Sequence, residues 1–231
     1  MPHALQAAHK TWSTPQYEVR SDGDISPLRE CLANAYARNS QYFEKDIPFF
    51  SIVIEEPPVT TANADNWLIG TPGYGSSPLT VKGPQFLKKT RNFELKDFEN
   101  LVAHEMCHRF QLAHFDFTTP CWLYEGMAGH VGEQTPADRY WWVLERGIND
   151  LADLHRPAQF YALGDYIGAF SIVYVLHTLS DKKTAMAFMS VSDRSDDFET
   201  SRAKFQEVFQ FSIDTLRDEW LSYLRGSRPR T

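Results

Sequence analysis

The sequence predicts an α+β fold for this 231-residue chain. Short apolar runs and alternating patterns typical of strands lie between residues 15 and 113, whereas residues 114–226 show helical periodicity almost throughout. A chain of this length can form one large domain or two lobes that share a core. We expect a single domain, residues 1–231, with a small sheet and helices in a first lobe, about 15–113, and only helices in a second, about 114–226.

The first lobe is expected to contain a strand, a helix, three further strands and a long helix, in that order. Residues 1–14 have the pattern of a loosely ordered lead, and Tyr17–Arg20 alternates as a strand does. Ser26-Pro27 then supplies an N-cap and a first helical position. Phe49–Glu55 has the pattern of a buried strand. The remaining elements expected here are strands at Trp67–Thr71 and Leu79–Val81 and a helix at about 96–113.

The second lobe contains repeated signals for helix starts. Thr119-Pro120 and Thr135-Pro136 each place a capping residue before a proline, which favours the first turn of a helix. Tyr166–Leu176 is strongly apolar and predicts a buried helix. Three more helices are expected at Lys182–Met189, Ser201–Phe209 and Ser212–Leu224.

The long helix carries His104, Glu105 and His108 in the pattern H-E-x-x-H. On an α-helix the two histidines lie about 40° apart on one face, one turn from each other, so both imidazoles can bind one cation. Glu105 projects about 60° to the side of His108, where a carboxylate can hold a water on the metal without ligating it. Two histidines one turn apart by chance are the alternative interpretation. The opposite face carries an apolar stripe that we expect to pack in the core: Val102, Met106, Phe110 and Ala113.

A catalytic zinc ion needs a third protein ligand, and two residues compete for this role. His114 would complete H-E-x-x-H-x-x-Q-x-x-H, which resembles the metzincin pattern, but Gln111 stands where that pattern has a helix-ending glycine. If the helix continues, His114 lies about 600° round from His108 and faces away from the metal. The other candidate is Glu125, on the helix that follows Thr119-Pro120.

The segment Trp122-Leu123-Tyr124-Glu125-Gly126-Met127-Ala128 resembles the W-L-x-E-G-x-A segment of gluzincin zinc metallopeptidases, in particular the small gluzincins of the peptidase MA-like group. The resemblance implies that His104, His108 and Glu125 bind Zn²⁺. It also implies a zincin-like two-lobed fold. Such a fold has a small mixed sheet plus helices in the N-terminal lobe, an all-helical C-terminal lobe and an active-site cleft between them.

This chain departs from the gluzincin pattern in two places. The connection between His108 and Glu125 is shorter than in thermolysin or the large aminopeptidases, so their substrate preferences are not carried over. Gly129 stands where thermolysin-like members have a carboxylate that orients a ligand histidine. We expect Glu133, Asp165 or a backbone carbonyl to take that role.

The resemblance implies zinc-dependent hydrolysis of a peptide or other amide bond. Glu105 would accept a proton from a zinc-bound water that attacks the substrate carbonyl, and would pass it to the leaving amine. In the resembled group a tyrosine near the start of the next apolar helix stabilises the oxyanion. Tyr166 is the matching residue and Tyr161 a nearby substitute, although either can instead be a core tyrosine. The substrate backbone would pair with the strand at Trp67–Thr71 or at Leu79–Val81.

Composition limits the partners and the location. A net charge of −7 without a basic cluster argues against a nucleic-acid or membrane surface. The partner that the resemblance implies is a peptide or protein substrate. The first residues lack an apolar signal segment, and three cysteines are an odd number for a disulfide framework. We therefore expect a soluble, cytoplasmic protein.

Two other functions use the same residues. The protein could be a catalytically silent binding or scaffold protein with a zincin fold, or an amide hydrolase that acts on a non-peptide substrate. Glu105 favours catalysis, because a scaffold has no reason to keep a carboxylate beside the two histidines.

Overall fold

The computed structural model of the protein describes residues 10–64, 68–134 and 140–227. The described chain has a mixed α+β fold, which confirms the predicted class. It divides into two compact units, Met1–Phe110 and Gln111–Thr231. The division falls inside one continuous helix, α4 (Leu95–Phe115), close to the predicted lobe boundary.

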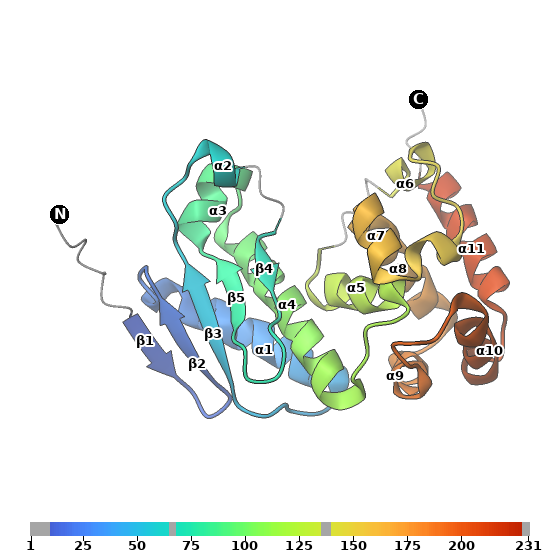
Figure 1. The fold of residues 1–231 in the computed structure, drawn as a ribbon, viewed down its shortest axis with the longest axis horizontal. Helices are drawn as coiled ribbons and strands as arrows, with labels where there is room; N and C mark the ends of the chain where they lie inside the picture. The colour runs from blue at the N-terminus through green and yellow to red at the C-terminus, as the bar shows by residue number, and fades with distance from the viewer. Residues whose placement is uncertain (1–9, 65–67, 135–139, 228–231) are drawn as a thin grey trace. The chain divides into compact units, whose positions relative to one another are not determined.

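Strands of the first unit form one mixed sheet in the order β1-β2-β3-β5-β4 (Figure 1). The inner pairs, β2 with β3 and β3 with β5, are parallel, and the outer pairs are antiparallel. Parallel neighbours need a crossover connection, which helix α1 (Arg29–Phe43) supplies between β2 and β3 after the 3-10 turn η1 (Ser26–Leu28). The strands are β1 (Lys10–Ser13), β2 (Tyr17–Ser21), β3 (Phe50–Glu55), β4 (Gly70–Thr71) and β5 (Leu79–Lys82).

Two strands differ from the sequence-based expectation. The predicted loose lead contains β1, whose Trp12 pairs with Val19 of β2. The hydroxyl of Thr14 stabilises the turn between β1 and β2 by accepting a hydrogen bond from the backbone N–H of Tyr17 at 3.1 Å. The strand expected at Trp67–Thr71 is the short β4, and Trp67 lies outside the described residues.

Two short helices of the first unit were not predicted, α2 (Thr61–Ala64) and α3 (Pro84–Arg91). Helix α3 begins with Pro84, and its first free N–H groups are bonded by a side chain distant in sequence. The carboxylate of Glu56 accepts from the N–H of Gln85 at 3.1 Å and of Phe86 at 2.9 Å. This capping depends on tertiary contact, so local sequence signals do not show it.

Helices α1 and α4 share the core of the first unit. The side-chain amide of Asn39 donates to the carbonyl oxygens of Ala35 and Ala103, each at 2.9 Å, and Phe110 stacks on Phe43 with ring centres 5.5 Å apart. Val102, Met106 and Phe110 are fully buried, as predicted. The prediction for Ala113 was wrong, because this residue is exposed. The apolar stripe is thus buried only up to Phe110, the last residue of the first unit.

The second unit is helical in its described residues. Its core helices, α5 and α8, pack closely because glycines face the neighbouring helix. A Cβ atom at Gly126 would lie 2.4 Å from Val173, and one at Gly129 would lie 2.1 Å from Phe170. The elements of this unit are α5 (Cys121–Val131), α6 (Trp142–Glu145), the 3-10 turn η3 (Leu151–Leu154), α7 (Pro157–Leu163), α8 (Tyr166–Leu179), α9 (Lys182–Val191), α10 (Phe198–Phe209) and α11 (Ile213–Gly226).

Most of these helices coincide with the predicted ones, and α7 was not predicted. Helix α5 begins one residue later than Thr119-Pro120 predicts: Pro120 takes the N-cap position and no side chain caps the first turn, so Thr119 is not the cap. The start expected at Thr135-Pro136 lies outside the described residues. The indole N–H of Trp220 on α11 donates to Ser171 of α8 at 2.8 Å, which joins two buried polar groups. Within the described ranges no single helix combines the length and apolar character needed to cross a membrane, although α7 and α8, bent by 116°, meet that test as a pair.

Candidate metal centre

Helix α4 presents His104 and His108 on one face, as the helical spacing predicts. Their Nε2 atoms lie 3.1 Å apart and their rings are nearly perpendicular, at 88°. Both side chains are buried, with 6% and 3% of their surface exposed. Two unprotonated imidazole nitrogens repel each other at this distance, so either a shared proton or a cation must lie between them.

Helix α5 supplies the third residue of the group. At the end of α4, the side-chain amide of Gln111 donates to the carbonyl oxygen of Tyr124 at 3.0 Å, which holds the start of α5 against the last turn of α4. Glu125 follows Tyr124 directly and is only 3% exposed. One ligand atom from each of His104, His108 and Glu125 lies within 4.8 Å of the others.

This donor set could hold a divalent metal ion. Two imidazoles and one carboxylate are a common set for a catalytic zinc site, in which the fourth position stays open. The 3.1 Å between the two Nε2 atoms is short enough for both to ligate one ion. His114, the competing third ligand from the sequence, is not a member of this group among the described residues.

Glu105 follows His104 on α4 and lies against strand β4. It is 7% exposed, and a Cβ atom placed on Gly70 would lie 2.6 Å from its Oε1 atom. The backbone of β4 therefore approaches the Glu105 carboxylate as closely as a glycine allows. Gly70 is not among the predicted site residues, although a glycine inside a strand pattern indicates close approach by another group.

The two tyrosine candidates have different surroundings. The hydroxyl of Tyr161 donates to Oε1 of Glu125 at 2.5 Å. Burial, reinforced by the Glu125 charge, raises the pKa of Tyr161, so this hydroxyl keeps its proton at neutral pH. The ring of Tyr166 packs against Phe160, Tyr161 and Phe170. The structure thus brings Tyr161 to a member of the metal group, and the role of Tyr166 stays a prediction.

The structure shows the surroundings of Gly129 and of the two side chains, Asp165 and Glu133, that were expected to orient a ligand histidine in its place. Gly129 cannot carry a carboxylate, because Phe170 occupies the space next to it. Asp165 lies at the start of α8, where its Oδ1 atom is 3.5 Å from Arg146, and burial raises its pKa. These contacts place Asp165 among the residues that hold α8. Glu133 begins the turn after α5 with a positive φ of 51°.

Cys121 lies one turn before Glu125 on α5 and is fully buried. Burial, followed by the nearby Glu125 charge, raises the pKa of its thiol. Cys31, Cys107 and Cys121 are all buried.

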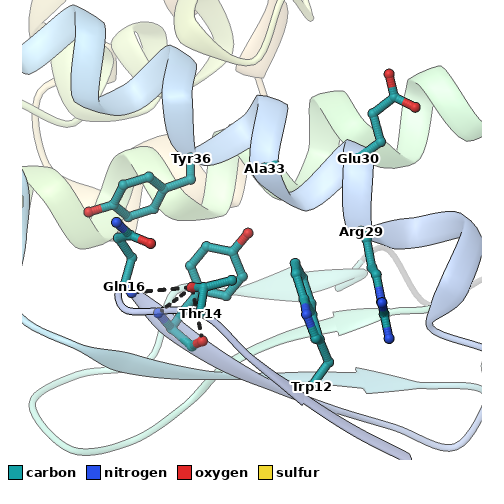
Figure 2. A pocket seen from close by; sticks show the side chains of 8 residues that line it. Trp12, Thr14, Gln16, Arg29, Glu30, Ala33 and Tyr36 are labelled. Carbon is teal, nitrogen blue, oxygen red and sulfur yellow. Dashed lines mark hydrogen bonds between the residues drawn. The ribbon is translucent and has the colours of Figure 1, made fainter.

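A hollow of about 440 Å³ opens on the first unit beside β1, β2 and α1 (Figure 2). Its lining includes Trp12, Tyr17 and Tyr36, and the Arg29 guanidinium lies 5.4 Å from the centre of the Trp12 ring. The predicted site residues do not line it, so it belongs to a different surface of the first unit.

Comparison of the chain with models of known protein families gives no match, and comparison with curated protein sequences gives none either. The geometry of the site and the local sequence motifs are therefore the basis for assigning a function.

Proposed function

We propose that this protein is a zinc-dependent peptidase of the gluzincin type, which hydrolyses a peptide or other amide bond. The observation that carries the proposal is the buried group His104, His108 and Glu125, with one ligand atom of each within 4.8 Å, beside Glu105. The mixed sheet before the H-E-x-x-H helix and the helices after it support a zincin-like fold as part of this proposal.

A bound zinc ion would supply Lewis acidity, which polarises the substrate carbonyl and makes water more acidic. The neutral imidazoles of His104 and His108 and the carboxylate of Glu125 would hold it. Glu105 would take the proton from the attacking water and deliver it to the leaving amine. Its burial keeps this carboxylate away from bulk water and so favours a fixed orientation.

A tyrosine hydroxyl would stabilise the oxyanion that forms on the substrate carbonyl. Tyr166 matches the gluzincin pattern. Tyr161 is the substitute candidate, but its single hydroxyl proton is already donated to Glu125, so it would serve the oxyanion only by leaving that bond. Removing such a donor typically costs about 100- to 1,000-fold in kcat.

The test is Glu105→Gln in the zinc-loaded protein, assayed on a library of fluorescence-quenched peptides and on N-acyl amides. We expect the variant to retain one zinc ion per chain, by metal analysis, and to lose about 100- to 10,000-fold in activity. The matched control is Glu94→Gln, which changes an exposed carboxylate just before α4 that pairs with Lys88. Unchanged activity in Glu105→Gln would show that the mechanism is wrong.

The same experiment separates the two other functions. A wild-type protein that binds zinc but cleaves neither class of substrate would be a silent binding or scaffold protein. Cleavage of the N-acyl amides alone would identify an amide hydrolase with a non-peptide substrate.

A further inference from the structure

Arg109 connects the H-E-x-x-H helix to the segment between strands β4 and β5. It follows Glu105 by one helical turn on α4. We call residues 72–78 the β4–β5 loop. The Arg109 guanidinium donates to three of its carbonyl oxygens, those of Ser77 at 3.1 Å, Gly75 at 3.2 Å and Pro72 at 3.5 Å. The planar fork of an arginine directs five N–H donors in fixed directions over a wide arc, whereas a lysine has a single compact ammonium with three donors.

The guanidinium is held from its other side by the sheet. Its central carbon lies 5.3 Å from the ring centre of Phe50 at the start of β3, a distance typical of a cation–π contact. The loop itself turns tightly, because a Cβ atom at Gly73 would lie 2.3 Å from the carbonyl oxygen of Pro78. Arg109 therefore joins α4, β3 and the β4–β5 loop at one point within the first unit.

The β4–β5 loop begins directly after β4, and β4 is the strand that touches Glu105. Gly70 pairs with Val81 of β5, and the carbonyl oxygen of Ile69 accepts from the N–H of Lys82 at 2.8 Å. Strand β4 is at the edge of the described sheet, so β5 is its one neighbouring strand there. Two contacts along α4 reach this strand and its loop: Gly70 lies against Glu105, and the loop carbonyls accept hydrogen bonds from Arg109.

We propose that Arg109 is a positioning residue for the hydrolytic reaction: it fastens the β4–β5 loop to α4 so that the backbone at Gly70 confines the carboxylate of Glu105. This inference rests on the proposed function. The physical reason is that a general base must be held in one orientation to transfer a proton efficiently. A displacement of about 1 Å can cost on the order of 100-fold in rate.

The test compares Arg109→Met with wild type in the zinc-loaded protein. We expect kcat for the best peptide of the library to fall about 10- to 100-fold, KM to change by less than about threefold, and zinc content to stay at one per chain. Hydrogen exchange at the Ser77 amide, which bonds the Tyr74 carbonyl at 2.9 Å, should become faster. The control Lys96→Met removes another cation from α4, one that pairs with Glu99, and should change neither kcat nor exchange.

Two further variants distinguish positioning from a general loss of stability. Arg109→Lys keeps the charge but cannot reach all three carbonyls, so its kcat should lie between those of wild type and Arg109→Met. If Arg109→Met does not fold, Arg109→Lys is compared with wild type in its place. Gly70→Ala displaces Glu105 directly and should lower kcat without faster exchange at Ser77.

Faster exchange at Ser77 with a wild-type kcat in Arg109→Met would overturn the positioning role while leaving the proposed function intact. Unchanged exchange would show that Arg109 does not fasten the loop, and would also overturn it. A zinc-loaded wild type that cleaves no substrate would refute the proposed function, and the positioning role with it.

Discussion

Removal of the Tyr161 hydroxyl tests how the third residue of the metal group is held. The hydroxyl donates to Glu125 at 2.5 Å, and Glu125 is only 3% exposed. Hydrogen bonds to charged groups contribute about 1.5–3 kcal/mol. The side chain of Tyr161 is 41% exposed as a whole, so solvent reduces the effect and we take the lower end, about 1.5 kcal/mol. This corresponds to roughly tenfold weaker zinc binding, which agrees with the typical effect of removing a partner of a metal ligand.

The assay is a competition between the protein and a chromogenic zinc chelator, which gives the zinc dissociation constant of wild type and Tyr161→Phe. The matched control is Tyr174→Phe on α8, which removes the hydroxyl of another half-exposed tyrosine in the same unit. We expect the control to bind zinc as wild type does. Equal zinc affinity in Tyr161→Phe and wild type would refute the argument that the hydroxyl positions Glu125.

Two further predictions follow from the described contacts. Glu125→Ala should lose bound zinc on dialysis and His114→Ala should keep it, as measured by metal analysis; loss of zinc in His114→Ala would make that histidine a ligand. His177 should weaken the fold in acid, because burial and the nearby His130 lower its pKa from 6.5 to about 4, so the unfolded chain binds a proton first as pH falls. The free energy of unfolding keeps the full contribution of neutral His177 above pH 6.5 and loses roughly 3 kcal/mol at most as the pH falls towards 4. In urea unfolding at several pH values, the free energy of unfolding of His177→Gln should depend less steeply on pH. An identical slope in the variant would contradict this assignment.

The helix that carries the chemistry could be predicted because its signals are local. His104 and His108 are one turn apart in the sequence, and any regular helix through them brings their imidazoles together. The starts of α5 and α8 were predicted for a similar reason, since proline and apolar runs act on the backbone next to them. Periodicity failed at Ala113, which continues the apolar stripe but is exposed, because a pattern does not show where the core ends.

The surroundings of the site could not be predicted in the same way. Nothing near Tyr161 in the sequence indicates that its hydroxyl reaches Glu125, and nothing near Arg109 indicates that it bonds the β4–β5 loop. Position 129 departs from the gluzincin pattern by lacking a carboxylate, and the Phe170 ring, which packs against Gly129, leaves no room for one. In each case a side chain meets a group far away along the chain.

By itself the sequence determined the fold class, the H-E-x-x-H helix and the segment that carries Glu125, because these depend on spacing and composition within a few helical turns. Only the tertiary structure decided which hydroxyl contacts Glu125, why position 70 is a glycine and what Arg109 holds. The reason is physical: helix geometry is set by neighbouring residues, whereas the close approach of β4 to Glu105 is set by how the sheet and α4 pack.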